Sequence, residues 1–287
     1  MKILILGGDG MLGHELLLQL RDRHDARVTL RQPLAAYSSK GLFDAGNAYA
    51  GIDVRAAGRV EAVLAEFRPE AVVNAVGIVP QRPESKQAIV SIEVNALMPH
   101  RLAVACRGTA RLVHLSTDCV FSGDKGNYSE TDRPDPTDLY GRSKLLGEVT
   151  DEGALTVRTS MIGRGLYRKT SLVDWFLAQQ GRVPGYRNAI FSGLSTFEIA
   201  RVIGMLLEKH PQASGLYHLS AAPISKLELL AKLRERLALK LEIVPADEPR
   251  IDRSLDSTRF RRVFGYAPPS WDAMLDELAG QIRRKAA

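Results

Sequence analysis

The segment Tyr140-Gly-Arg-Ser-Lys144 places a phenol and an ammonium four residues apart. On a helix, side chains at this spacing lie on one face, so both can act on the same group. A phenol has a pKa of about 10 in water, and a neighbouring ammonium would favour its ionised form at lower pH. We therefore predict that Tyr140 is a general acid and that Lys144 positions a bound cofactor beside it.

A third polar side chain is expected at the same place. The predicted strand over residues 110–116 delivers Ser116, Thr117 and Asp118 at its carboxyl end, where ligands bind in open α/β sheets. Thr117 can donate a hydrogen bond to the oxygen that Tyr140 protonates. Thr117, Tyr140 and Lys144 are thus predicted to carry out proton and hydride chemistry on a carbonyl or hydroxyl group.

Near the N-terminus, Gly7, Gly10 and Gly13 stand at three-residue intervals. Glycines in such a turn let the backbone approach a pyrophosphate, which the following helix N-terminus stabilises. The alternative is a strand-to-helix turn that holds no ligand. Because a strand pattern precedes the turn and a helix pattern follows it, we predict a dinucleotide site in which Met11 and Leu12 also take part.

The type of dinucleotide is indicated by Arg31, which follows the second predicted strand. Proteins that bind NAD usually carry an acid there, whereas a guanidinium suits the 2′-phosphate of NADPH. NADPH is therefore expected and NADH is less favoured, the alternative being that Arg31 only ends a strand in solvent. The remaining expected cofactor contacts are Asp53, Val54, Asn74, Ala75, Val76 and Gly77.

The elements that position these residues alternate through the first half of the chain. Short apolar runs and amphipathic stretches follow one another, which predicts an α/β fold with a Rossmann-type doubly wound parallel sheet. Strands are expected over residues 2–6, 26–30, 48–52, 71–76, 110–116 and 155–158. Helices are expected over residues 12–23, 60–67, 89–107, 195–208 and 225–237.

After Arg158 this alternation loosens, and glycines and prolines mark turns. We predict an NADP-binding Rossmann domain over residues 1–158, with a return segment near 189–220. Residues 159–188 and 221–287 are predicted to form a smaller C-terminal substrate-binding lobe.

The composition narrows the class of protein. The chain has 287 residues, 45% hydrophobic and 25% charged, as in an ordinary globular protein. Charges or glycines interrupt every apolar stretch, so no membrane span is expected. Two cysteines favour a reducing cytoplasm, and the histidines lack a metal-ligand spacing, so no metal is expected. The net charge of +6 admits a nucleic-acid partner, but scattered surface charge is the simpler interpretation and no nucleic acid is expected.

These residues together resemble an extended short-chain dehydrogenase/reductase, and within that class the dTDP-4-dehydrorhamnose reductases. The class-level matches are Gly7-x-x-Gly10-x-x-Gly13, Asp53, Asn74-Ala75, Asn95, Ser116-Thr117 and Tyr140-x-x-x-Lys144. The closer matches are residues 116–123, Tyr128-Ser-Glu130, residues 136–148, Arg158-Thr-Ser160 and Leu255-Asp256.

The resemblance implies that NADPH delivers hydride to C4 of a nucleotide-linked 4-keto-6-deoxyhexose, in the synthesis of cell-surface polysaccharide sugars. The family commonly has aromatic residues at the positions of Cys119 and Met161, so the pocket for sugar or base is expected to differ. A UDP-linked 2-acetamido sugar is therefore a second candidate substrate. The expected substrate contacts are Asp118, Cys119, Arg158, Met161, Arg250 and Arg253, the arginines serving the diphosphate.

Other functions stay open from the sequence. A non-catalytic NADP-binding subunit, like the regulatory subunit of methionine adenosyltransferase, resembles the same reductases. Nucleotide-sugar dehydratases place a glutamate where this chain has Cys119, and a thiol is a poor substitute for that base. Epimerases keep NAD bound, which Arg31 disfavours. A homodimer is also compatible with the sequence.

Overall fold

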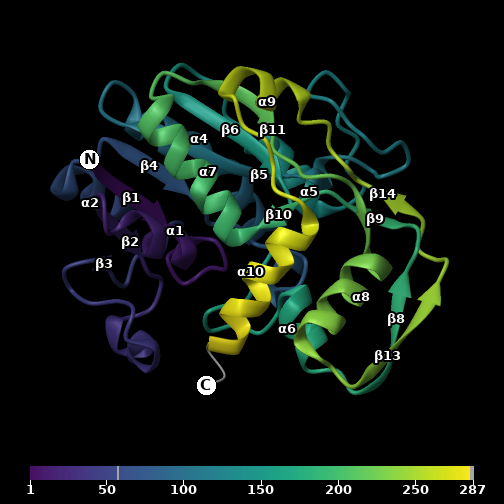
Figure 1. Cartoon of the computed structure of the whole chain (residues 1–287). Coiled ribbons are helices and arrows are strands. Elements are labelled where there is room, and N and C mark those ends of the chain that lie inside the picture. Colours follow the sequence, from purple (N-terminus) through teal and green to yellow (C-terminus); the bar gives the residue numbers. More distant parts are fainter. Residues whose placement is uncertain (57, 285–287) are drawn as a thin grey trace.

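The apolar run at the N-terminus forms strand β1 (Lys2–Leu6), in the interior of the main sheet (Figure 1). Ile3 and Ile5 face one layer of helices and Leu4 and Leu6 face the other, and all four side chains are fully buried. Strands covered on both faces are typical of parallel sheets, whose crossover helices lie on both sides. The computed structural model describes residues 1–56 and 58–284, so residues 285–287 of the predicted substrate lobe lie outside the described residues.

The main sheet has seven strands, all parallel, in the order β3-β2-β1-β4-β5-β6-β11. The chain winds outward in both directions from β1, which confirms the predicted Rossmann-type doubly wound fold. Ligands in such sheets bind at the carboxyl ends of the strands, beside the point where the order reverses. Besides β1, the strands are β2 (Asp25–Thr29), β3 (Ala48–Tyr49), β4 (Ala71–Asn74), β5 (Arg111–Thr117), β6 (Ala154–Thr159) and β11 (Gly215–His218).

Helices cover both faces of this sheet. On one face α1 (Gly13–Leu20) packs against α7 (Thr196–Lys209). The other face carries α2 (Arg59–Phe67), α5 (Leu139–Leu146) and a helical run made of α3 (Ala88–Ser91), a π-helical turn η3 (Ile92–Leu97) and α4 (Met98–Cys106).

The run Ala88–Cys106 is, among the described residues, the helix long and apolar enough by length and composition to cross a membrane. Half of that stretch is buried inside the protein, where it packs against α5 and β5. This burial is typical of a core helix.

The second half adds small sheets and helices beside the main sheet, with α8, β8 and β13 grouped at one side in Figure 1. Strand β11, which lies within residues 189–220, re-enters the main sheet beside β6. The additional strands are β7 (Met161–Ile162), β8 (Gly181–Tyr186), β9 (Ala189–Phe191), β10 (Leu194–Ser195), β12 (Ile224–Ser225), β13 (Leu241–Ala246) and β14 (Ile251–Asp252). The additional helices are α6 (Leu172–Leu177), α8 (Lys226–Leu237), α9 (Thr258–Phe264) and α10 (Trp271–Arg284), with short 3₁₀ turns η1 (Leu34–Lys40), η2 (Pro83–Lys86) and η4 (Asp118–Val120).

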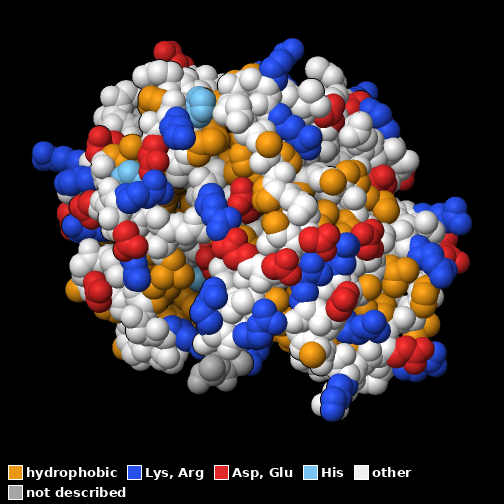
Figure 2. Space-filling model, in the orientation of Figure 1, with side chains coloured by type: hydrophobic (Ala, Val, Ile, Leu, Met, Phe, Trp, Pro, Cys, Tyr) orange, Lys and Arg blue, Asp and Glu red, His pale blue; other side chains and the backbone are white. Residues whose placement is uncertain are grey.

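The observed elements differ from the expected ones mainly at their ends. Strand β4 stops at Asn74 rather than at residue 76, because the Asn74 side-chain oxygen accepts a hydrogen bond from the Val76 amide and turns the chain. Figure 2 shows basic and acidic side chains mixed over one face of the molecule, as expected for scattered surface charge.

Helix α5 is held close to the helical run by Gly147, which follows its last turn. A Cβ at Gly147 would collide with the backbone carbonyl of Asn95 in η3. The absence of a side chain at Gly147 therefore sets the distance between the two helices.

We predict that Gly147→Ala lowers the free energy of unfolding by roughly 1–3 kcal/mol, because the added methyl group must displace the Asn95 backbone. Urea denaturation followed by circular dichroism measures this change. Gly280→Ala in α10 is the matched control, because a Cβ there makes only an ordinary 3.4 Å contact with Arg284. An unchanged stability in Gly147→Ala would mean that the two helices are not in close contact.

Candidate active site

Tyr140 lies in the first turn of α5, next to the end of β5. Asp138 caps this helix by accepting a hydrogen bond from the Gly141 amide at 2.7 Å. A Cβ at Gly141 would collide with the carbonyl oxygen of Cys119, so the helix start packs directly on η4. This close approach brings Tyr140 beside Thr117.

Lys144, one turn further along α5, is 4% exposed. Its Nζ donates a hydrogen bond to the Leu115 carbonyl of β5 at 2.6 Å and lies 3.5 Å from His114 Nε2. Burial lowers the pKa of Lys144 to about 8, and the negative charge of Glu148 opposes part of that change. The side chain is therefore an ammonium below about pH 8.

The expectation that an ammonium lowers the pKa of Tyr140 is wrong for this structure. Burial is the largest cause and raises the pKa of the phenol, and Cys119 and Asp118 raise it further while Thr117 lowers it. Tyr140 thus retains its proton at neutral pH. A phenol that keeps its proton is suited to donate it to an alkoxide as that alkoxide forms.

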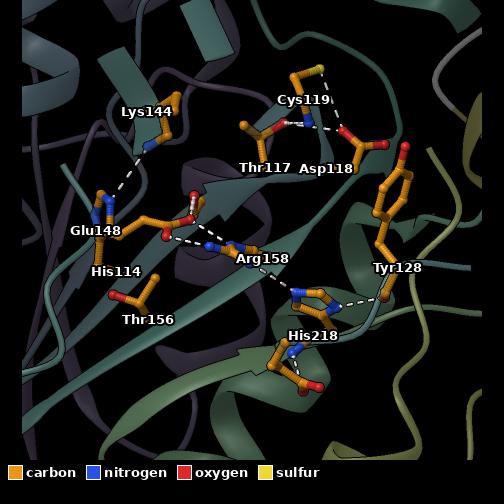
Figure 3. A network of polar contacts seen from close by, with 12 residues as sticks. His114, Thr117, Asp118, Cys119, Tyr128, Lys144, Glu148, Thr156, Arg158 and His218 are labelled. Carbon is orange, nitrogen blue, oxygen red and sulfur yellow. Dashed lines mark hydrogen bonds and ion pairs between the residues drawn. The ribbon is translucent and has the colours of Figure 1, made fainter. Parts of the chain in front are cut away.

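Polar groups of η4 surround the Thr117 hydroxyl (Figure 3). This hydroxyl donates to Asp118 Oδ1 at 3.1 Å and accepts from the Cys119 amide at 3.1 Å. Arg253, from the C-terminal part of the chain, donates to the Phe121 carbonyl at 2.9 Å and lies 3.7 Å from Cys119 Sγ. The structure therefore gathers Thr117, Asp118, Cys119 and Arg253 at one place.

The other three expected substrate contacts are Arg158, Arg250 and Met161. Arg158 is 3% exposed, and its Nε and Nη2 each donate to a Glu148 oxygen at 2.7 Å, so its assignment to a substrate diphosphate is corrected to a structural ion pair. Arg250 is largely exposed and pairs with Glu248 at 3.4 Å. Met161 is half-buried in β7 and packs against the main core. Arg158 is therefore engaged within the protein, whereas substrate contacts of Arg250 and Met161 stay predictions.

A hollow lies at the carboxyl ends of β1, β2 and β4. It contains eight of the residues predicted to bind the cofactor, namely Gly7, Gly10, Arg31, Asp53, Val54, Ala75, Val76 and Gly77. The residues that sequence reasoning missed there are Asp9, Thr29, Ile52, Arg55, Ile78, Arg82, Glu84, Gln87, Val90, Val94 and Arg168. Thr117, Tyr140 and Lys144 are not part of its lining, so the candidate site has two parts.

Two predicted contacts, Asn74 and Gly13, are corrected because neither residue lines this hollow. Asn74 is fully buried and hydrogen-bonds to His114 and to the Val76 amide. Gly13 is buried where α1 packs on the Gly7 carbonyl, so its absent side chain serves helix packing. Met11 and Leu12, in the same turn, are not among the lining residues.

The charge of this hollow favours an anion. Its lining includes four arginines and three acids, which are Arg31, Arg55, Arg82, Arg168, Asp9, Asp53 and Glu84. Asp53 is held by Arg55 with a shortest contact of 2.6 Å, whereas Arg31 lies a loose 3.9 Å from Glu84. Burial and the nearby Arg168 lower the pKa of Arg82. Gathering guanidinium groups in this way is stabilised by a bound anion such as phosphate.

Arg168 reaches this hollow from the second half of the chain. The hydroxyl of its neighbour Tyr167 donates to the Tyr37 carbonyl at 2.6 Å, which holds the segment against η1. The rings of Tyr37 and Tyr167 also pack edge to face with centroids 5.2 Å apart. No local motif marks Arg82 or Arg168 as ligands, because only the tertiary fold brings them together.

The two parts of the site are joined by Asn95. Its side chain accepts from the Ile78 amide at 2.8 Å and donates to the Ile78 carbonyl at 3.0 Å and to Ser143 Oγ at 3.1 Å. Ile78 lines the hollow and Ser143 precedes Lys144 in α5.

Among the residues that the structure describes, His, Cys, Asp and Glu form no group able to hold a metal ion.

This doubly wound sheet, with its glycine turn, is a Rossmann-type fold, and the Tyr-x-x-x-Lys helix α5 lies beside β5. Residues 1–284 match the RmlD substrate binding domain, and the chain belongs to that family.

Individual relatives agree with this family. A probable dTDP-4,6-dihydroxy-2-methyloxan-3-one 4-ketoreductase of Streptomyces antibioticus is 33% identical to this chain over 187 residues. The match covers 63% of this chain and 58% of that protein. A dTDP-4-dehydrorhamnose reductase of Aggregatibacter actinomycetemcomitans is 24% identical over 96% of this chain and 98% of its own length. The crystal structure of a Bacillus anthracis dTDP-4-dehydrorhamnose reductase in complex with NADP covers 98% of this chain and 99% of that one at 22% identity, with a TM-score of 0.79, which shows the shared fold.

We predict that Cys119 resists alkylation, because burial and the neighbouring Asp118 raise the pKa of its thiol to about 12. At pH 8 almost none of it is thiolate, so iodoacetamide should modify it far more slowly than it modifies the urea-unfolded chain. Peptide mass spectrometry separates Cys119 from Cys106, whose thiol pKa burial also raises to about 12. Equal rates for Cys119 in the native and unfolded chains would contradict the prediction.

Proposed function

We propose that this protein reduces the C4 keto group of a nucleotide-linked 4-keto-6-deoxyhexose with NADPH, in the synthesis of cell-surface polysaccharide sugars. The observation that carries the proposal is the placement of Thr117, Tyr140 and buried Lys144 together at the carboxyl end of β5. Membership of the RmlD family and the reductase relatives support it. A dTDP-linked sugar and a UDP-linked 2-acetamido sugar are the two candidate substrates.

The cofactor, when bound, supplies the hydride that reaches the carbonyl carbon. Tyr140 donates its proton to the carbonyl oxygen, which its raised pKa allows because the proton is retained at neutral pH. When substrate binds, the Thr117 hydroxyl would turn its single proton from Asp118 Oδ1 to the same oxygen and stabilise the charge that develops there. Lys144, as an ammonium below about pH 8, orients the nicotinamide ribose.

The hollow beside the glycine turn fits the phosphates of such a cofactor. Gly7 and Gly10 leave the backbone accessible to a pyrophosphate, and Arg31 lies where β2 ends, as a 2′-phosphate requires. Arg82 and Arg168 add positive charge to the same hollow. Arg168 belongs to residues 159–188, which are predicted to form part of the substrate lobe. We propose that this segment also contacts the cofactor.

The proposed division of labour follows the chain. Residues 1–158, with the return segment near 189–220, hold the cofactor, and residues 159–188 and 221–287 form most of the substrate lobe. Arg253, an arginine of that lobe, contacts the Phe121 carbonyl and Cys119 Sγ, so we propose it for the substrate diphosphate. A cytoplasmic location and a homodimer stay predictions.

A non-catalytic NADP-binding subunit is the second candidate. It would explain the arginine-lined hollow equally well, but it gives no reason to keep Tyr140 beside Thr117 and a buried Lys144. An epimerase or dehydratase is disfavoured by Arg31 and by the thiol at Cys119, whose raised pKa prevents it from acting as a base at neutral pH.

We predict that Tyr140→Phe lowers kcat for NADPH oxidation by about 10²- to 10⁴-fold, because the proton donor is lost. The substrate is the 4-keto-6-deoxy sugar nucleotide made in place by a dehydratase from dTDP-glucose or from UDP-N-acetylglucosamine. The Kd of NADPH, measured by calorimetry, should stay within about twofold of the unsubstituted protein. Full turnover in Tyr140→Phe would contradict the assigned role, and NADPH binding without turnover of either sugar by the unsubstituted protein would favour the regulatory subunit.

We also predict that Arg31→Ala raises the Kd of NADPH by roughly tenfold or more and leaves the Kd of NADH nearly unchanged, because only NADPH carries the 2′-phosphate. Calorimetry with both cofactors measures the two effects. Arg182→Ala is the control, since Arg182 is an exposed arginine paired with Glu242 in the β8–β13 sheet. An equal loss of affinity for both cofactors would place Arg31 elsewhere on the dinucleotide.

A further inference from the structure

A buried polar chain ends at Lys144 of α5, and its other two members, Asn74 and His114, have no part in the chemistry described above. It runs from Asn74 at the end of β4 through His114 on β5 to Lys144 on α5. Asn74 and His114 are fully buried and Lys144 is 4% exposed. Figure 3 shows the His114 ring turned toward the Lys144 ammonium. Buried polar groups in such a chain must be matched donor to acceptor, so their hydrogen positions can be deduced.

The Val76 backbone amide can only donate a hydrogen bond. It lies 3.1 Å from Asn74 Oδ1, so that oxygen is the acceptor and the orientation of the Asn74 amide is fixed. The amide nitrogen then faces His114 Nδ1 at 2.9 Å, and it also lies 3.8 Å from Met98 Sδ, a weak acceptor. An –NH₂ group donates, so His114 Nδ1 must accept and carries no proton.

His114 is neutral, because burial and the charge of Lys144 hold its pKa well below the usual value. A neutral imidazole with an unprotonated Nδ1 carries its proton on Nε2. This N–H points at Lys144 Nζ, 3.5 Å away. The His114 N–H and the Lys144 ammonium are both donors and cannot hydrogen-bond to each other. The ammonium donates instead to the Leu115 carbonyl of β5 at 2.6 Å.

We propose that Asn74 holds His114 in the Nε2–H form, and that this N–H is a positioning group that denies Lys144 a second acceptor on the sheet side. The remaining ammonium protons are then directed away from the sheet, toward the side where the ribose of a cofactor would lie. The proposal rests on the proposed function for the role of Lys144, but the protonation state of His114 does not depend on it.

The charges and dipoles around Lys144 also affect the pKa of its ammonium. Burial destabilises the charge of Lys144, and Glu148, which follows α5, stabilises it. We infer that the positive end of the His114 N–H dipole, 3.5 Å from Nζ, acts in the same direction as burial. Tyr140, one turn earlier, is uncharged because its pKa is raised. From the helical run, His100 acts on His114 rather than on Lys144, and it lowers the His114 pKa.

The first test reads the proton position directly and needs no variant. A long-range ¹H–¹⁵N correlation spectrum of the ¹⁵N-labelled protein at pH 7 distinguishes the two neutral forms of each histidine and the charged form. We expect His114, assigned by its disappearance in His114→Gln, to show a protonated Nε2 and an unprotonated Nδ1. A protonated Nδ1 or a charged ring would overturn the proposal, whatever the enzyme activity.

The second test measures the effect on Lys144 through NADPH binding at pH 7 and pH 9. With the pKa of Lys144 at about 8, the unsubstituted protein should bind about tenfold more weakly at pH 9, because the ammonium is lost. In the double variant Asn74→Ala/His114→Gln no amide donor holds the glutamine oxygen, so this oxygen can turn to Lys144 and raise the pKa of the ammonium, and the loss should fall to less than about threefold.

His218→Gln is the matched control, because His218 is also fully buried in the main sheet but contacts Arg158 and the Tyr128 carbonyl. It should keep the tenfold loss. An unchanged loss in Asn74→Ala/His114→Gln, in a variant whose circular dichroism is native, would overturn the proposal. Binding that does not change between pH 7 and pH 9 in the unsubstituted protein would instead remove the role proposed for Lys144.

Discussion

The position of helix α5, which carries Tyr140 and Lys144, depends on one buried ion pair, Glu148 with Arg158 (Figure 3). Glu148 follows α5 and Arg158 lies on β6, and both oxygens of the carboxylate are held by the guanidinium at 2.7 Å. Ser116 on β5 donates to the same carboxylate at 2.7 Å, and His218 on β11 lies 3.3 Å from the remaining Arg158 nitrogen. Removing one partner would leave a buried charge unpaired, which costs about 3–5 kcal/mol. The pair thus fixes α5 on three strands, and with it Tyr140 and Lys144.

The same helix is joined to the cofactor hollow through neutral hydrogen bonds. Asn95 contacts both Ile78 in the lining and Ser143 in α5, so the two parts of the site keep a fixed relation. Hydride transfer requires such a relation, because the donor and the carbonyl must be held at close range. Charged side chains therefore occur in two different settings. Glu148 and Arg158 are paired and buried beside α5, whereas arginines outnumber acids in the lining of the hollow proposed for the cofactor.

The sequence predicted the fold well, because alternating apolar runs and helical patterns are local properties. That the glycine turn lies between a strand and a helix, and that Tyr140 and Lys144 lie on a helix beside the strand ending at Thr117, could likewise be predicted from spacing. Arg158 could not be interpreted from its type, since nothing local shows that the carboxylate of Glu148 engages its guanidinium. Arg82 and Arg168 were missed for the converse reason, because contacts between distant segments place them in one hollow. The raised pKa of Tyr140 also follows from burial, which spacing does not reveal.

The most direct test of the central claim follows the transferred hydrogen. NADPH carrying deuterium at C4 of the nicotinamide, in separate samples for its two faces, is incubated with the protein and the 4-keto-6-deoxy sugar nucleotides, and the product is examined by NMR and mass spectrometry. We expect one deuterium on C4 of the sugar, with a new hydroxyl at the same carbon, from one of the two labelled cofactors and none from the other. NADPH consumption without deuterium at that carbon, or no product from either nucleotide, would contradict it.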